Sequence, residues 1–472
     1  MSNKQSLLLI SGSLLLNAHT IGSDVNLVCI TPGEKLKVSD FMGNDKTSKC
    51  SKNKCSEETN TSLFCQLCEH ESTTNLIKIE SYSILIIRFS FDCIEFDISL
   101  VAIPKVQNLD AQKINDQALA NLLNQFNWTN SEHKNMSRTL ASYRSTLYIA
   151  NLFFGEITMA DDSTKSLMNI LEQQQSFSNS NDNSRNFRQL FMAIKFWSKN
   201  NFIYSNKMGF LNGMALSIMV AKIVLLYPNA SLQFLLEKFF LIYSTRPLQI
   251  PIQLTKTEQK NSFPDALNAL NPKELEMPVF TPTFCPLQNA TRFVTHSNAK
   301  VIRRQMAQAL SKINSMKNRP FNLDAFLNVA IPFTERYANF VVINCMAEEK
   351  ELADSFCGFV EWRMRLQIIF DIDKKGGSIE THLNPNVYRE TCDLPSKLVQ
   401  TTAFRPIFCK VWLLAIVNDS VMPEQLNVMA NQFDVTIKKQ FINMNHKEIL
   451  APKLALKSIL MKREKLLELD GA

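Results

Sequence analysis

Three side chains in two apolar segments are candidates for holding metal ions beside a phosphate. Asp24 and Asn26 lie two residues apart in a predicted strand, so both point to the same side of a sheet. Asp97 lies in a later apolar segment, in the second strand of a predicted hairpin. Carboxylate and amide oxygens suit Mg²⁺ and Mn²⁺, and pairs of such ions support phosphoryl transfer. These three residues are therefore the candidate catalytic and metal-binding residues.

A Gly-Ser pair at the start of the chain could contact phosphate oxygens. Gly12 and Ser13 follow the apolar run 7–10, and a second apolar run follows at 27–30. This pattern predicts a strand, a tight turn, a short helix or loop, and a second strand. Glycine lets the backbone approach a ligand closely, and Ser13 offers a hydroxyl and an N–H at a helix start. Taken alone, such a turn is more often structural than catalytic.

Two lysines one helical turn apart add positive charge to this picture. Lys195 and Lys199 lie on a predicted helix over 186–199, so both ammonium groups can project toward one phosphate chain. The alternative is a solvated basic face. Trp197 on the same helix is expected in the core. Apolar periodicity predicts further helices at 110–126, 165–175, 209–226 and 231–243. A polar tract predicts a connection at 173–184.

Taken together, these motifs resemble the polymerase beta-type nucleotidyltransferase superfamily and, within it, the eukaryotic nuclear poly(A) polymerases. The resemblance rests on the Gly-Ser turn, on His19-Thr20-x-Gly22-x-Asp24 and on the distant strand aspartate. Further segments look like the central domain of that family: 193–213, 226–230, 238–240 and 277–289. The similarity runs unevenly over nearly the whole chain, which is identified as a divergent member.

The resemblance implies template-independent addition of AMP from ATP to RNA 3′ ends, as in mRNA polyadenylation, with two Mg²⁺ or Mn²⁺ ions. Asp24 and Asn26 would bridge the ions, and Asp97 would hold the ion at the RNA 3′-OH. Lys195 would bind the triphosphate and Tyr204 the nucleotide. The residues implied to bind ATP and its metal ions are Ser11, Gly12, Ser13, Thr20, Asp24, Val25, Asn26, Asp97, Lys195, Tyr204, Gly213 and Met214.

Several positions depart from the family pattern. The family has Asp where this chain has Asn26, so one negative charge is missing, which implies a loss of about 10²- to 10⁴-fold in rate. Glu95 could partly substitute. Leu14 and Leu15 replace polar residues, and the Gly-Ser strand is expected within the first dozen residues, without the helices that precede it in the family. The alternatives are a pseudoenzyme that binds RNA or a partner, and a relative that transfers CMP or UMP.

The predicted fold class is α+β with three domains. Residues 1–104 are expected to form a small mixed-sheet nucleotidyltransferase domain with a Cys-rich insertion at about 43–75, and residues 105–328 a helical central domain. Residues 329–472 are expected to form a ferredoxin-like or RRM-like RNA-binding domain.

In this last domain, strands are predicted at 336–345 and 404–417, a helix at 351–370, and helical structure from 425 onward. No paired sheet aromatics for base stacking are evident. The basic residues of the closing segment suit RNA phosphates or a solvated helix face: Lys438, Lys439, Lys447, Lys453, Lys457, Lys462, Arg463 and Lys465.

Composition sets broad limits on location and partners. The 472 residues carry a net charge of +7 with a pI near 8.7, which is consistent with an anionic partner. Eleven cysteines indicate a reducing compartment, and no apolar run is long enough for a membrane span. The resemblance implies a nuclear monomer that binds ATP, an RNA 3′ end and 3′-end processing factors.

One group of cysteines leaves two interpretations open. Cys65-x-x-Cys68 is a possible zinc half-site, with Cys50, Cys55 and His70 nearby. Reduced surface cysteines in an insertion are the alternative.

Overall fold

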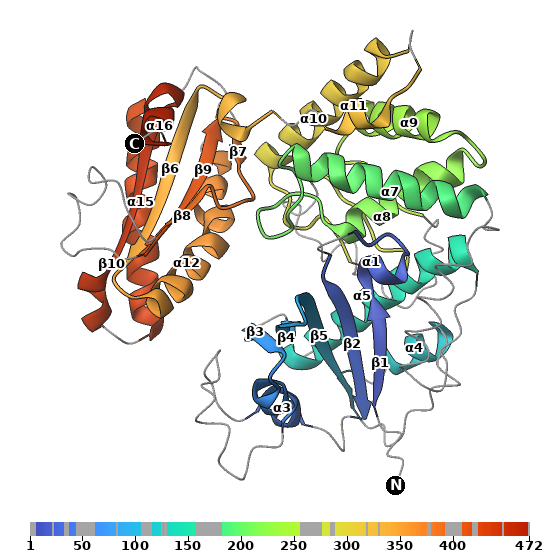
Figure 1. Ribbon diagram of the computed structural model, residues 1–472, viewed down its shortest axis with the longest axis horizontal. Coiled ribbons are helices and arrows are strands. Elements are labelled where there is room, and N and C mark those ends of the chain that lie inside the picture. The colour runs from blue at the N-terminus through green and yellow to red at the C-terminus, as the bar shows by residue number, and fades with distance from the viewer. Residues whose placement is uncertain are drawn as a thin grey trace.

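The protein contains two sheets with a helical region beside them (Figure 1), which confirms the predicted α+β class. The computed structural model describes residues 6–20, 23–32, 37–43, 62–81, 84–104, 116–123, 126, 130–155, 182–254, 276–283, 288–317, 320–328, 331–374, 379–391, 408–417, 423–445 and 448–470. The predicted helix at 165–175 and most of the connection at 173–184 lie outside these residues.

The first sheet is mixed, with strand order β1-β2-β5-β4-β3. Strands β2 and β5 pair in parallel, and the other neighbours pair antiparallel. The predicted N-terminal strands and the predicted hairpin are both present. The elements of this part are β1 (Leu7–Ser11), α1 (Gly12–Leu15), β2 (Val25–Pro32), α2 (Val38–Met42), α3 (Leu63–Glu69), β3 (Thr73–Ser81), β4 (Ile84–Phe91) and β5 (Ile94–Ile103).

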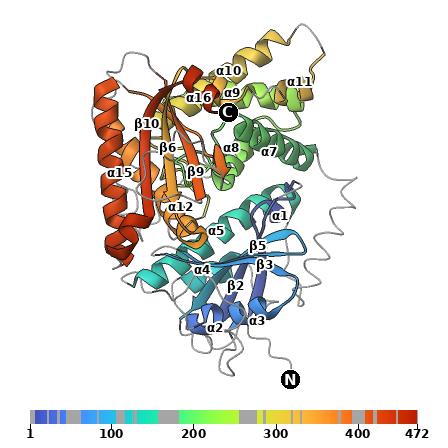
Figure 2. The same ribbon diagram turned by 60° about the vertical axis from the view of Figure 1, so that its left-hand side comes forward.

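Helix α5 (Ser131–Phe154) packs against this sheet, and α4 (Asp116–Leu123) packs against α5 (Figure 2). The sheet contributes fully buried side chains such as Ile30 and Val101 to their common core. Sequence periodicity did not predict α5. The reason is that Ser137, Arg144 and Ser145 are buried along this helix, so polar residues interrupt its apolar stripe.

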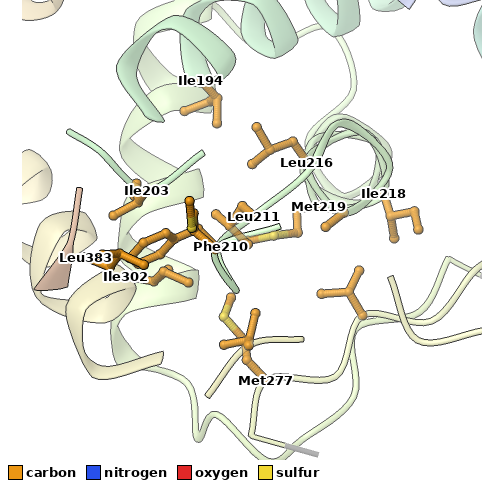
Figure 3. Packing of buried hydrophobic residues seen from close by; sticks show 14 of the residues in the cluster. Ile194, Ile203, Phe210, Leu211, Leu216, Ile218, Met219, Met277, Ile302 and Leu383 are labelled. Carbon is orange, nitrogen blue, oxygen red and sulfur yellow. The ribbon is translucent and has the colours of Figure 1, made fainter. Parts of the chain in front are cut away.

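Within the described residues, the helical region contains five helices besides α4 and α5. These are α7 (Asp182–Asn200), α8 (Gly213–Leu226), α9 (Leu232–Thr245), α10 (His296–Ser315) and α11 (Leu323–Leu327). Figure 3 shows its core, where Phe210 and Leu211 lie among side chains of α7, α8 and α10. Leu383, from the second sheet, reaches the same cluster, so the two parts share a core.

Helix α8 begins later than the predicted start at 209. Gly209 has φ +80°, a left-handed conformation that a helix cannot contain. The Asn212 side chain accepts from Ala215 N at 2.8 Å and caps the helix instead. Trp197 is buried with its ring 4.7 Å from that of Phe240, which confirms the prediction that it belongs to the core.

The second sheet is antiparallel, with order β10-β6-β9-β7 and with β8 paired to β9. Helices α12 and α15 pack against it and against each other. Its elements are β6 (Asn339–Ala347), α12 (Lys350–Met364), a π-helical turn (Arg365–Ile369), α13 (Phe370–Lys374), β7 (Thr381–Leu383), β8 (Arg389–Thr391), β9 (Phe408–Ile416), α15 (Pro423–Asn445), β10 (Leu454–Lys462) and α16 (Arg463–Asp470).

Two sequence predictions about local structure are wrong. The chain is not helical throughout from residue 425, because Leu454–Lys462 forms strand β10, where Leu454, Leu456 and Ser458 alternate inward. The Cys-rich insertion at about 43–75, whose polar composition is typical of a loop, is not loop throughout either. Leu63–Glu69 forms α3, and Phe64 and Cys65 of this helix are part of the core. Among the described residues, no helix is both long enough and apolar enough to cross a membrane.

Candidate active site

Three of the predicted site residues lie side by side across the first sheet. Ser11 on β1 pairs with Asn26 on β2, and Asn26 pairs with Asp97 on β5. Neighbouring strands lie about 4.8 Å apart, so the Asn26 and Asp97 backbones are immediate neighbours. The parallel pairing of β2 with β5 therefore brings together two residues that are far apart in the sequence.

The Gly-Ser turn rests directly on Asn26. Gly12 has φ +65°, and a Cβ added at this position would lie 3.3 Å from Asn26 Nδ2. A side chain here would be strained and crowded, which explains the glycine. Leu14 and Leu15, which replace polar residues of the family pattern, are buried in the core. Their side chains therefore serve packing and do not face a ligand.

Asp24 faces the helical region. Its charge counteracts the lowering of the Lys195 pKa, which arises from burial and from the nearby Lys199. Burial and the charge of Asp24 together raise the pKa of Tyr204 to about 12. Lys199 Nζ lies 5.8 Å from the centroid of the Tyr204 ring. The charge of Asp24 thus acts on both Lys195 and Tyr204, and Lys199 lies near the same tyrosine ring.

Tyr204 lies next to Gly213, another residue that the resemblance implies in ATP binding. It forms an isolated parallel bridge with Leu211. A Cβ added at Gly213 would lie 3.4 Å from Tyr204 Oη, so the backbone of Gly213 is close to the phenol. Met214 is partly buried against the core at the next position. The structure therefore places Tyr204, Gly213 and Met214 close to one another.

The segment between the turn and Asp24 contains a buried imidazole. His19 Nδ1 has no hydrogen-bond partner among the described residues. Burial lowers the pKa of His19, and the charges of Arg188 and Lys195 lower it further. By contrast, Thr20 bonds locally, with its hydroxyl 2.9 Å from Ser23 Oγ. Val25 is half-buried at the start of β2.

Arg88 is a site residue that sequence reasoning missed. It lies opposite Asp97 in the β4–β5 hairpin, and its Nε and Nη2 donate to Asp97 Oδ1 and Oδ2 at 2.7 and 2.6 Å. This bond raises the Arg88 pKa, and the charges of Asp24 and Glu95 also raise it. In a hairpin whose turn includes Asp92, residues equally distant from the centre of the turn face each other, so counting residues outward from the turn would have paired Arg88 with Asp97.

These side chains do not fit a pair of divalent ions in the observed arrangement. Asp24, Glu95 and Asp97 carry three negative charges, Arg88 neutralises that of Asp97, and Asn26 offers only a neutral carbonyl. Two divalent ions would bring four positive charges to this place. Among the described residues, no three or more His, Cys, Asp or Glu side chains gather as a metal-binding group.

The cysteine half-site gains no support in the described part of the chain. Cys65 and Cys68 are buried on α3, and neither forms a disulfide. Cys50 and Cys55 lie outside the described residues. His70 Nδ1 accepts from Ser72 N at 3.3 Å.

Asp24 directly precedes β2, Lys195 lies on α7, and Tyr204 lies in the segment between α7 and α8. Residues 186–328 match the family model "Poly(A) polymerase central domain". These residues include Lys195, Tyr204 and Gly213. The match confirms the resemblance predicted from the motifs and relates the chain to the poly(A) polymerase-type nucleotidyltransferases.

Curated relatives agree with this relationship. Nuclear poly(A) polymerase 2 of Arabidopsis thaliana is 28% identical over 44% of this chain and 26% of its own length. Nuclear poly(A) polymerase 1 of the same plant is 22% identical over 80% of this chain and 46% of its own length. The chain thus matches less than half the length of either relative. A solved structure of Cid1, described as an RNA terminal uridylyl transferase, aligns over 69% of this chain and 86% of that one, with 13% identity and a TM-score of 0.40.

Proposed function

We propose that the chain is a template-independent polynucleotide adenylyltransferase that adds AMP from ATP to RNA 3′ ends. The observation that carries the proposal is that Asp24, directly before β2, lies close enough to Lys195 and Tyr204 for its charge to raise the pKa of both. A nucleotidyltransferase needs acidic strand residues and a cation for the triphosphate at one place. Nucleotidyltransferases of this family use a divalent metal ion and a nucleoside triphosphate.

The side chains suggest how a nucleotide would be held. Lys195 is a largely buried cation with Lys199 nearby, so a bound triphosphate would offset the repulsion between them. The backbone at Ser11, Gly12 and Ser13 would lie along the same phosphates. Tyr204 and the backbone of Gly213 would contact the base, and adenine would be selected there because no template strand is read.

In the transfer, the RNA 3′ oxygen bonds to the α-phosphorus of ATP, the 3′-OH proton passes to the Asp97 carboxylate, and the bond from the α-phosphorus to the oxygen that bridges it to the β-phosphate breaks to release pyrophosphate. Asp97 is the carboxylate proposed to lie nearest the 3′-OH. Both of its oxygens are bound to Arg88 in the observed arrangement. Transfer therefore requires this pair to open when the substrates bind.

We further propose the domain limits 1–104, 105–328 and 329–472, with the last domain as a ferredoxin-like, RRM-like RNA-binding unit. The order from β6 to β10 supports that topology: it reads strand, helix, strand, strand, helix, strand when the short strands β7 and β8, which both pair with β9, are counted as one. Exposed lysines on α15 and at the end of β10, such as Lys439 and Lys462, would contact RNA phosphates. Lys447 lies outside the described residues.

The named relatives are nuclear poly(A) polymerases, which supports proposing a nuclear location for this chain. Action as a monomer, together with mRNA 3′-end processing factors, belongs to the same proposal.

A second candidate function is binding of ATP and RNA without turnover. Two observations favour it: Asn26 is neutral, and Arg88 occupies both oxygens of Asp97. In this case the site would hold a nucleotide and an RNA end but would not bring the 3′ oxygen to the phosphorus.

An extension assay separates these functions. The full chain is incubated with a labelled oligo(A) primer, Mn²⁺ and ATP, CTP or UTP in separate reactions, and binding of labelled ATP and primer is measured alongside. Extension with ATP alone, abolished by Lys195→Ala, supports adenylyl transfer. Binding without extension supports the second candidate. Equal extension with CTP or UTP contradicts adenine selection.

A further inference from the structure

A cavity lined by both apolar and polar side chains lies where the helical region meets the second sheet. Its volume is about 600 Å³, within the range of about 300–1,000 Å³ found for small-molecule sites. It lies among the end of α7, helices α10 and α11, and the segment 331–337 that leads into β6. Trp197 lines it, two residues from Lys195 on α7, so the cavity and the candidate active site lie on nearly opposite sides of this helix.

Arg336 is held in the wall of this cavity by neutral groups only. Its Nε donates to Ile331 O at 2.9 Å, its Nη1 to Asn201 Oδ1 at 3.2 Å, and its Nη2 to Asn200 O at 2.9 Å. No described carboxylate forms an ion pair with it. A guanidinium has five N–H donors, so two remain for a ligand. Burial lowers the pKa of Arg336, as expected for a cation without a counterion.

Two cations of α10 stand beside it. Lys312 Nζ donates to Phe326 O at 2.9 Å and forms no ion pair with a described carboxylate, which leaves two of its three N–H donors. Arg304 Nη1 pairs with Glu380 at 3.2 Å, but Glu380 is shared with Lys300 at 3.4 Å. Arg304 Nη2 is buried and has no partner among the described residues. Positive charge in this wall is therefore incompletely compensated.

The lining carries three cations and one acid. Among the described lining residues, Glu335 is the acid, and it is exposed. Burying a cation without an opposite charge is unfavourable, and an anion in the cavity would relieve this cost. The guanidinium fork of arginine matches the oxygens of a phosphate group.

The spacing of the cations indicates the size of the anion. Arg304 and Lys312 are eight residues apart on α10, which corresponds to about 12 Å along the helix axis. A chain of two or more phosphates, or a nucleotide, can span this separation and contact both side chains. The lining also contains the side-chain amides of Gln305 and Gln308 and the exposed Ile331. The amides can form hydrogen bonds with a polar molecule.

We propose that this cavity is a second binding site, for a small molecule that carries two or more linked phosphate groups. Inorganic tripolyphosphate and ATP share this chemistry, and they differ in whether a base contributes. The site is separate from the proposed catalytic function, and it stands or falls independently of that function.

Titration calorimetry with tripolyphosphate tests the proposal in the full chain carrying Lys195→Ala, which weakens the candidate active site. Gln308→Glu places a carboxylate on the exposed wall of the cavity, and Ala307→Glu places the same charge one residue away, outside the lining. We expect Gln308→Glu to weaken binding about tenfold and Ala307→Glu less than about twofold. Lys312→Gln should also weaken binding several-fold. The same titrations with ATP show whether a base adds affinity.

The proposal is overturned by any of three results. The first is no tripolyphosphate binding in the Lys195→Ala chain, which would assign all phosphate binding to the active site. The second is an equal effect of Gln308→Glu and Ala307→Glu, which would indicate a general charge effect. The third is binding of single-stranded oligo(A), but not of tripolyphosphate, that responds to Gln308→Glu, because the cavity would then take an RNA backbone.

Discussion

The guanidinium of Arg88 donates to both carboxylate oxygens of Asp97, at 2.7 and 2.6 Å, across one antiparallel hairpin. A bidentate pair of this kind satisfies the carboxylate fully and fixes its orientation. Asp97 is the acid that the family resemblance places at the RNA 3′-OH. The availability of Asp97 therefore depends on a residue that the motif does not contain.

Arg88→Gln should free Asp97 and strengthen Mn²⁺ binding at least about tenfold, because the positive charge competing for the carboxylate is removed. Arg88 is half exposed, so the cost in stability should be about 1 kcal/mol or less. Calorimetric titration with Mn²⁺ measures the gain. Adding Asp97→Asn to the variant should cancel it; if it does not, the ion binds elsewhere.

Asn26→Asp should raise primer extension with ATP and Mn²⁺ by about 10²-fold or more, because it adds a carboxylate beside Asp97 that would hold Mn²⁺, and the ion would stabilise the negative charge of the transition state. Without metal, like charges on neighbouring strands should lower the melting temperature. Mn²⁺ should restore it. If Mn²⁺ restores the melting temperature of the variant but the extension rate stays unchanged, Arg88 and not residue 26 limits the reaction.

Lys195→Ala should weaken ATP binding by about 10- to 100-fold, since a hydrogen bond to a charged group contributes about 1.5–3 kcal/mol. Equilibrium binding of labelled ATP is the measurement. Lys238→Ala is the matched control: Lys238 lies on α9, 4.8 Å from the Phe234 ring, and should leave ATP affinity unchanged. Comparable losses in the two variants would contradict a specific role for Lys195.

Stability should fall as the pH is lowered from about 6.5, because of His382. This imidazole is fully buried, hydrogen-bonded to Tyr337 Oη at 2.6 Å and to Phe202 O at 2.9 Å. Burial lowers its pKa to about 3. Between pH 6.5 and 3 the unfolded chain binds a proton that the folded chain does not, so stability drops as the pH decreases, by about 2 kcal/mol at pH 5.

Melting temperatures of the parent and of His382→Gln between pH 5 and 8 check this expectation. Glutamine can keep both hydrogen bonds but cannot titrate. The variant should show a flatter pH profile. Parallel profiles for the two proteins would assign the acid sensitivity to other groups.

Gly12→Ala should destabilise the protein by about 1–3 kcal/mol, because alanine is strained at φ +65° and its Cβ would press on Asn26. Gly358→Ala is the control, since this glycine lies inside α12 with no atom within 4 Å of an added Cβ. It should gain about 0.5–1 kcal/mol from helix propensity. Denaturant unfolding measures both, and equal effects would refute the strain at Gly12.

Local pattern was enough to predict many elements. The strand–turn–strand unit around Gly12, the hairpin that carries Asp97, and the helix that carries Lys195 follow from apolar period and turn residues. Strand β10 was missed because its alternation is short and follows the long helix α15. Helix α5 was missed because buried polar side chains break its stripe.

The sequence by itself determined which side chains are available: a neutral Asn26 two residues after Asp24, two lysines on one helix face, and a glycine where the backbone turns sharply. Local geometry fixes these, since neighbours in the chain are neighbours in space. Only the tertiary structure decided that Asn26 lies beside Asp97, that Arg88 binds that acid, and that Asp24 faces Lys195. These relationships depend on strand register and on packing between distant segments, which no local spacing encodes.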